Sequence, residues 1–146
     1  NNDGLYVGTA TSARWADLAE RYTADDIYPA GTVLAIDING DKEVTLYQPG
    51  MPLAGCVSTL PAVMMNDMGY DPDDKSIDAM MAPFIALKGR IPVLIHGSAK
   101  KGQWVIADVD GKGRAVDYGT SGINSHEIIG IAIGDCDGEG EVEVKV

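Results

Sequence analysis

Histidine is the side chain most often used for acid–base chemistry, and this chain of 146 residues has two, His96 and His126. A catalytic zinc ion needs three convergent ligands, and the sequence has neither an HExxH nor a CxxC motif. Ser125-His126-Glu127 contains the residue types of a hydrolytic triad, but neighbours on an extended chain point to opposite faces. We interpret His126 as a loop residue before a buried strand; pairing with a distant Ser or Thr is the alternative. The prediction is no catalytic residue and no cofactor.

Three acidic turns, at residues 37–41, 108–111 and 135–139, invite a calcium interpretation. A helix-flanked calcium loop needs oxygen ligands at positions 1, 3, 5 and 12 and glycine at position 6. Here glycine comes at position 4, the flanks have the pattern of strands, and Asp-Gly and Asn-Gly are what tight turns need. We predict turns and no metal site, with a weak cation site at Asp135, Asp137 and Glu139 as the alternative.

Thiol and phosphate chemistry find little support in the sequence. Cys56 and Cys136 could pair, but nothing else resembles a small disulfide scaffold, so two buried thiols are the favoured interpretation. This leaves the redox compartment open. No GxxxxGK[ST] or GxGxxG motif follows a strand and opens a helix, which argues against nucleotide binding.

The overall charge excludes two classes of partner. Asp and Glu number 22 against 11 Lys and Arg, for a formal net charge of -11. Such a chain repels a phosphate backbone and an anionic membrane surface, so we expect neither nucleic acid nor membrane as a partner. No apolar run has the length of a transmembrane span.

The elements that must position these residues are mostly short strands bounded by glycine. Asn39-Gly40 predicts a hairpin, and Lys88-Gly89-Arg90 predicts a second tight turn. Regular short strands of this kind predict an all-β fold, mostly antiparallel, such as a sandwich, a barrel or a β-clip. The predicted strands cover residues 32–38, 43–47, 53–59, 84–87, 91–95, 103–107, 114–117, 128–133 and 141–146.

The N-terminal part of the chain lacks the strand pattern of the rest. Residues 1–12 are predicted to be a connector, and residues 13–146 a single β-rich module. Within residues 13–22, apolar side chains recur at helical spacing after Ser12, which predicts at most one short N-terminal helix; an irregular strand is the alternative. Because the chain starts at Asn1 and closes on a strand-like segment, we expect it to be the C-terminal module of a longer protein.

A methionine-rich insertion at residues 64–83 interrupts the strand pattern. A loop of this length in a small domain is usually functional or packed on a partner, and methionine suits adaptable contact surfaces. We predict an interface here; the alternative is that the methionines fold back to fill gaps in the core. The candidate interface residues are Met64, Met65, Met68, Met80 and Met81.

Six short segments together carry a resemblance to a known family. They are WADLAERY (15–22), PAGTVL (29–34), AGCVSTLPA (54–62), IALKGRIPV (85–93), KKG (100–102) and IGIA (129–132). In this order and spacing they resemble a domain at the C-terminal end of bacteriophage tail-fibre, appendage and other virion proteins. That family is described as an intramolecular-chaperone, autoproteolytic domain of the peptidase G2 type, and its opening Ala-Asp-x-Ala-Glu motif is similar to residues 16–20.

The resemblance implies a virion location, other virion proteins as partners, and a homo-oligomer, with a trimer favoured. In such domains self-cleavage uses a hydroxyl side chain beside the acidic residue that opens the motif. Here Asp17 follows Ala16, and the nearest hydroxyl groups in sequence belong to Ser12 and Thr11. Self-cleavage is therefore not carried over, and if the chain is processed we expect the junction before Asn1.

Three functions remain open on the sequence. The first is a non-enzymatic virion structural module, such as a capsid-attached fibre, a decoration protein or a tail-fibre tip. The second is an autoproteolytic chaperone that trimerises its parent fibre. The third is a receptor- or glycan-binding tip that uses exposed aromatic residues. The aromatic candidates are Trp104 and Tyr118 above all, with Trp15 and Tyr47.

Overall fold

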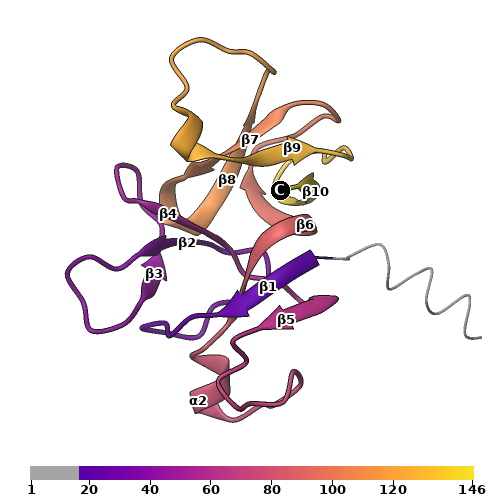
Figure 1. Ribbon diagram of the computed structural model, residues 1–146. Helices are drawn as coiled ribbons and strands as arrows, with labels where there is room; N and C mark the ends of the chain where they lie inside the picture. The colour runs from indigo at the N-terminus through magenta and orange to yellow at the C-terminus, as the bar shows by residue number, and fades with distance from the viewer. Residues whose placement is uncertain (1–16) are drawn as a thin grey trace, which may run out of the picture.

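Ten strands and one short α-helix make up residues 17–146, the part of the chain that the computed structural model describes (Figure 1). The first half contains β1 (Asp17–Arg21), β2 (Val33–Ile36), β3 (Val44–Leu46), β4 (Leu53–Cys56), β5 (Val63–Met65) and α2 (Ile77–Met80). The second half contains β6 (Phe84–His96), β7 (Trp104–Asp108), β8 (Lys112–Val116), β9 (Ile128–Ala132) and β10 (Gly140–Lys145). Two 3-10 turns, Val109–Gly111 and Ser125–Glu127, join strands in this half. The all-β fold class is confirmed.

Five strands close into a small barrel. Around it, β6 pairs with β8, β8 with β7, β7 with β9, β9 with β10, and β10 again with β6. The closing pair is the longest, running from Gly140↔Ile95 to Lys145↔Arg90. The β6–β8 pair is parallel, whereas the other pairs in the ring are antiparallel. Because closure pairs both sides of each strand, the barrel has little free edge.

Two further elements extend from β6. Its first half pairs antiparallel with β1, which in turn pairs parallel with β5. A separate three-stranded sheet in the order β3-β2-β4 lies beside the barrel. The two parts are tied together by the bridge Val57↔Ile85 and by Gly111, whose amide donates to the carbonyl oxygen of Tyr47 (3.0 Å).

The core of the barrel is built on alternate residues of the long strand β6. Ile91, Val93 and Ile95 are nearly fully buried inside the barrel, where Val142 and Val144 of β10 meet them. Burying an aliphatic side chain of this size stabilises the fold by roughly 1.5–3 kcal/mol. A second cluster lies between the small sheet and β6. No helix within residues 17–146 is long and apolar enough to cross a membrane.

Most of the predicted strands are present. The predicted helix over residues 13–22 is wrong for residues 17–22, the part of it that the structure describes. Residues 17–21 form β1, with Asp17, Ala19 and Arg21 buried and the residues between them half-buried. This strand lies between β5 and β6 and bonds to both, so pairing on two sides overrides the helical spacing of its apolar residues. Residues 13–16 lie outside the described residues, as does the predicted connector.

The predicted tight turn at residues 88–90 is also wrong. β6 runs without a break through Gly89, which has φ +120°. Asp17 pairs with Gly89 and Lys145 pairs with Arg90, so two different strands hold the two halves of β6 in line. The Asn39-Gly40 hairpin is confirmed as a β2–β3 pair, but its loop is longer than two residues and the Asp37 carboxylate accepts a bond from the Gly40 amide (3.0 Å).

Candidate interaction surface

The methionine-rich segment is an ordered arm built from β5, a loop and α2. Val63, Met64 and Met65 form β5 and are 56%, 39% and 44% exposed. Met80 on α2 is 38% exposed, whereas Met68 and Met81 are half-buried. Three of the five candidate methionines therefore lie on the surface, and the other two are partly covered.

Arg21, at the end of β1, anchors this arm. It is 4% exposed, and its Nη1 atom donates to the carbonyl oxygens of Ala79 (3.1 Å) and Ala82 (2.7 Å). Its Nη2 atom donates to the carbonyl oxygen of Asp71 (2.9 Å), and the guanidinium lies 4.2 Å from the centre of the Phe84 ring. A single buried cation thus binds backbone from both ends of residues 71–82, which fixes α2 against β1.

Local caps complete the arm. The Ser76 hydroxyl accepts a bond from the Ala79 amide, and the Asp74 carboxylate accepts one from the Ser76 amide (2.8 Å). The bond from the Ser76 backbone lowers the pKa of Asp74. Asn66, which adopts a left-handed φ of 47°, donates from its side chain to the carbonyl oxygen of Arg21 (3.3 Å). These contacts make the arm a rigid feature.

β5 is the open edge of the seven-stranded sheet. Within residues 17–146 it pairs with β1 alone, so its outer side carries backbone groups that no described strand engages. Successive side chains of a strand point to opposite faces, and all three here are apolar and exposed, so both faces of β5 are uncovered. Exposed apolar edge strands pair readily with other chains.

A basic pocket lies at the other end of β1. It has a volume of about 290 Å³ and is lined by Lys88, Gly89, Arg90, Ile133, Lys145 and Val146. The three cationic side chains are exposed, and Arg90 Nη1 lies 3.5 Å from the Glu143 carboxylate. Its floor is apolar, so the pocket suits an acidic partner that also offers apolar side chains.

The two aromatic candidates for glycan contact lie together. The rings of Trp104 and Tyr118 have centres 5.2 Å apart at an interplanar angle of 52°, and Tyr118 is 70% exposed. Polar groups stand next to them, since Gln103 Nε2 donates to the Asp117 carboxylate (3.0 Å). Tyr47 is only 1% exposed, so it is a core residue and not a contact residue, and Trp15 lies outside the described residues.

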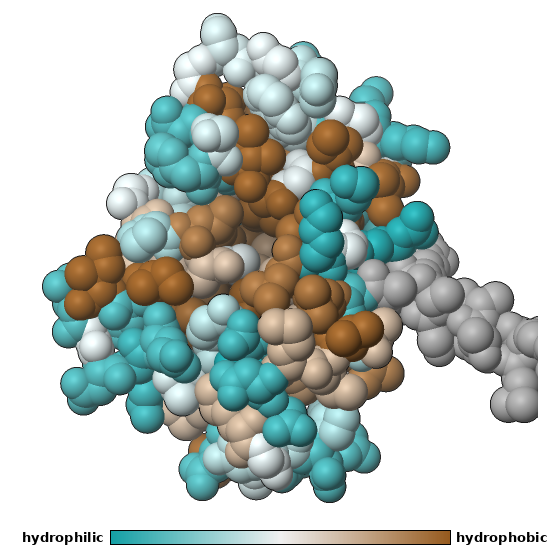
Figure 2. Space-filling view, in the orientation of Figure 1, coloured by the Kyte–Doolittle hydropathy of each residue, from teal (hydrophilic) through white to brown (hydrophobic). Residues whose placement is uncertain are grey.

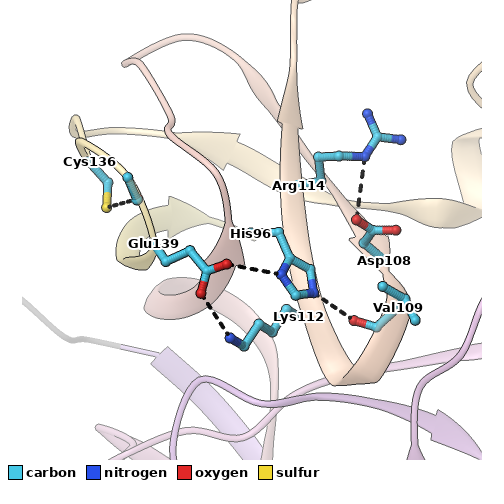
Figure 3. Close-up of polar contacts among 8 residues, drawn as sticks. His96, Asp108, Val109, Lys112, Arg114, Cys136 and Glu139 are labelled. Carbon is cyan, nitrogen blue, oxygen red and sulfur yellow. Dashed lines mark hydrogen bonds and ion pairs between the residues drawn. The ribbon is translucent and has the colours of Figure 1, made fainter.

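The structure places the two histidines in different surroundings. His96 Nε2 lies 3.1 Å from the Val109 carbonyl oxygen, and its Nδ1 lies 3.7 Å from the Glu139 carboxylate (Figure 3). Residues 125–127 form a 3-10 turn directly before β9, so His126 lies in a connection before a strand as expected, and its side chain is exposed. A pocket of about 330 Å³ includes His126 and Glu127 in its lining. In the part of the chain described, no serine or threonine hydroxyl bonds to either imidazole.

The acidic turns serve structure. Glu139 lies 3.6 Å from Lys112 Nζ, and Asp135 accepts a bond from the Lys101 amide (2.8 Å). Two of the three residues of the alternative cation site, Asp135 and Glu139, thus make contacts within the protein. No group of three His, Cys, Asp or Glu residues that could hold a metal ion occurs within residues 17–146. Asp108 likewise pairs with Arg114 (3.4 Å; Figure 3).

The hydroxyl that the sequence lacks beside Asp17 is supplied in space by Ser58. Both residues are buried, and within the described residues neither Asp17 Oδ2 nor Ser58 Oγ has a hydrogen-bond partner. Burial raises the pKa of Asp17, and the nearby Ser58 hydroxyl opposes this shift although the pair lacks hydrogen-bond geometry. Sequence reasoning missed this pair because 41 positions separate the two residues, and Ser12 and Thr11 lie outside the described residues.

An apolar hollow separates the small sheet from the barrel. Figure 2 shows hydrophobic residues gathered there, around a pocket of about 200 Å³. Its lining includes Cys56, whose pKa burial raises to about 12, so this thiol is not a nucleophile near neutral pH. Cys56 and Cys136 are both free thiols; Cys56 is buried as expected, whereas Cys136 is only half-buried.

Comparisons with known proteins identify the fold. No protein-family model matches the sequence, and no curated protein matches it significantly. The C-terminal fragment of bacteriophage phi29 gene product 12 aligns with a TM-score of 0.62 and 15% identity, over 89% of this chain and 99% of that one.

Two further solved structures show likeness. The pre-mature form of phi29 gene product 12 aligns with a TM-score of 0.61 and 15% identity, over 90% of this chain and 21% of its own. The base of the phi29 head fibre gene product 8.5 aligns with a TM-score of only 0.46 at 16% identity, over 88% and 92%, and supports no argument. The chain therefore has the fold of the C-terminal fragment of bacteriophage phi29 gene product 12.

Proposed function

We propose that this chain is a non-enzymatic structural module of a bacteriophage virion, in a capsid-attached fibre, a decoration protein or a tail-fibre tip. It assembles with copies of itself, as a trimer by the family resemblance, and contacts other virion proteins. The observation that carries the proposal is the exposed apolar edge of β5 beside a closed barrel. The fold shared with a bacteriophage protein supports the virion location.

The exposed edge of β5 argues for assembly, because exposing its apolar side chains to water does not stabilise an isolated chain. Exposed hydrophobic edges are a liability that proteins usually blunt with charge, proline or a covering element. β5 itself is Val-Met-Met, without charge or proline, and within residues 17–146 no other strand than β1 pairs with it. A partner surface that covers Val63, Met64 and Met65 removes the liability.

The test is mass spectrometry of purified phage particles that encode the chain. Peptides from residues 17–146 in the mature particle, in stoichiometric amount, support the structural module. The module is taken to comprise residues 13–146, preceded by the connector 1–12. Complete absence of these peptides from particles and lysate fractions of assembled fibres contradicts a structural role.

The same measurement separates the second function, an autoproteolytic chaperone that trimerises its parent fibre. The matched structures include both a pre-mature form and a C-terminal fragment of one gene product, which favours keeping this candidate. It predicts a shortened parent in the particle and a discrete released fragment that contains residues 17–146. An intact parent in the mature particle rejects it.

A glycan-binding tip is the third candidate, and the Trp104–Tyr118 pair favours it. One exposed ring beside a second ring and a Gln103–Asp117 polar pair offers both stacking and hydrogen bonding to a sugar. A glycan array probed with the full chain and with Tyr118→Ala tests this. Binding that is lost in the variant supports the candidate, and equal signals from both proteins reject these residues as the site.

A further inference from the structure

The charges around the open edge of β5 are strongly acidic. Residues 67–78, which follow β5, contain five aspartates and one lysine. Asp71 and Asp73 are exposed, and the buried Arg21 fixes the backbone of this segment. These charges lie on the arm described above, and we refer to its residues 63–78 as the acidic arm. A partner that covers it must offer apolar contacts with positive charge around them.

The same chain carries a surface of the opposite kind, the basic pocket. Its apolar floor includes Ile133 and Val146, and its rim carries Lys88, Arg90 and Lys145. The acidic arm and the basic pocket are thus complementary in charge and alike in their apolar character.

The charged part of the arm and the basic pocket lie at opposite ends of β1. Asp17 pairs with Gly89 at the pocket end of β1, whereas Arg21 binds the arm at the opposite end. Five residues of strand separate these ends by about 13 Å. The complementary charges therefore remain available to a second molecule.

We infer that the acidic arm of one copy docks into the basic pocket of the next copy, so that the copies close into a ring. This inference rests on the proposed function, because it names the surface through which the module assembles. A contact between two different surfaces is heterologous, and repeated by rotation it gives a cyclic assembly and not a face-to-face dimer.

The apolar start of the arm lies nearer to the pocket than the charged part of the arm does. Lys88 pairs with Leu18, and Leu18 pairs with Val63, so the pocket and the start of the arm lie two strands apart. Two strand spacings amount to about 10 Å. A second copy that reaches the pocket therefore also comes close to the β5 edge.

The inference is tested by charge reversal in the full 146-residue chain, with mass measured by sedimentation equilibrium. Asp71→Lys with Asp73→Lys reverses the arm, and Lys88→Asp with Lys145→Asp reverses the pocket while keeping the Arg90–Glu143 ion pair. We expect each double variant to raise the dissociation constant of the assembly at least tenfold. The quadruple variant restores attraction and is expected to return to within about threefold of the wild type.

Lys100→Asp with Lys101→Asp is the matched control, because it changes the charge equally on exposed residues of the turn before β7. It should leave the mass unchanged. A wild type that assembles while both double variants assemble equally well, or a quadruple variant that stays dissociated, overturns the inference and leaves the proposed function standing. A wild type that remains a monomer at every concentration overturns both.

Discussion

At the scale of single residues, two buried charged groups explain more of this protein than its histidines do. Arg21 and Asp17 lie on the same buried face of β1, each 4% exposed. Arg21 organises the arm through backbone carbonyl groups, whereas Asp17 has a buried oxygen with no partner in the described part of the chain. The first stabilises the arm and the second weakens the fold in a pH-dependent way.

Replacing Arg21 by Met should unfold the arm and lower the free energy of unfolding by about 2–3 kcal/mol. The Met side chain fills similar space, but the carbonyl groups of Ala79 and Ala82 lose their buried donor. Urea denaturation measures the loss. Arg114→Met is the control: its ion pair with Asp108 is half-exposed, so the change should stay under about 1 kcal/mol. Equal losses in the two variants contradict the anchoring role.

Asp17→Asn should change the pH dependence of stability. Burial raises the pKa of Asp17 in the folded chain above its ordinary value of 3.8, so the folded state binds the proton more tightly than the unfolded state. The resulting destabilisation is absent below pH 3.8 and grows as pH rises through the folded-state pKa.

The free energy of unfolding of Asp17→Asn minus that of the wild type should therefore be larger at pH 7 than at pH 3.5. Thermal or urea unfolding across this range measures the difference. The exposed Asp73→Asn serves as control and should differ by under about 0.5 kcal/mol at either pH. A difference for Asp17→Asn that grows as pH falls contradicts the sign of the shift.

At the scale of elements, the open edge of β5 is the feature from which function is argued. Met64→Lys places a charge on that edge, as natural edge strands do. Because Met64 is already 39% exposed, the stability of a monomer should change by less than about 1 kcal/mol, while self-assembly should be lost. Size-exclusion chromatography with light scattering measures assembly.

Ile38→Lys is the matched control for the edge variant, since Ile38 is 71% exposed in the β2–β3 loop. It also removes an exposed apolar side chain, yet assembly should persist. If Ile38→Lys dissociates the protein as completely as Met64→Lys, general loss of surface hydrophobicity is the cause and the edge has no special role.

Gly111 tests how the barrel is joined to the small sheet. It has φ +69°, and a Cβ atom there would overlap the Leu46 side chain and lie 3.0 Å from the Val33 carbonyl oxygen. Gly111→Ala should cost about 2–4 kcal/mol, from backbone strain and overpacking together. Gly119 has φ +82°, but a Cβ atom there would meet open space. Gly119→Ala should therefore lower the free energy of unfolding by about 1 kcal/mol. Equal losses of unfolding free energy in the two variants, measured by denaturation, would show that contact with the small sheet adds nothing to the cost at position 111.

The sequence predicted these elements unevenly, for physical reasons. Strands with period-two burial, such as β10 with Val142 and Val144 inward, follow directly from alternation. β1 was missed as a strand because Leu18, Ala19 and Tyr22 also fit a helical face, and only pairing with β5 and β6 decides between them. β6 was divided in two because glycine after lysine suggests a turn, whereas pairing with β1 up to Gly89 and with β10 from Arg90 onward keeps β6 one continuous strand.

The methionine interface stays a prediction, and the other parts of the candidate surface gave weaker signals in the sequence. The methionines drew attention by composition, and three of them are exposed. Arg21 gave no local signal in the sequence, because its partners lie 50 to 61 positions away. Likewise, the basic pocket joins residues of β6 with Lys145 and Ile133, and only barrel closure brings these together.

At the scale of the whole molecule, charge is divided between two regions. Residues 17–83 carry twelve acidic and three basic side chains, whereas residues 84–146 carry nine and seven. A closed barrel whose sheet extension ends in the open apolar edge of β5, together with this uneven charge, is suited to assembly by contact between unlike surfaces. Salt should weaken such an assembly, because part of its attraction acts between exposed charges.

The mass of the native protein in dilute buffer tests the central claim, that a second molecule covers the edge of β5. Native mass spectrometry of the intact chain is expected to give a whole-number multiple of 15.4 kDa, with three copies favoured. A mass of 15.4 kDa at micromolar and higher concentrations alike would contradict the account.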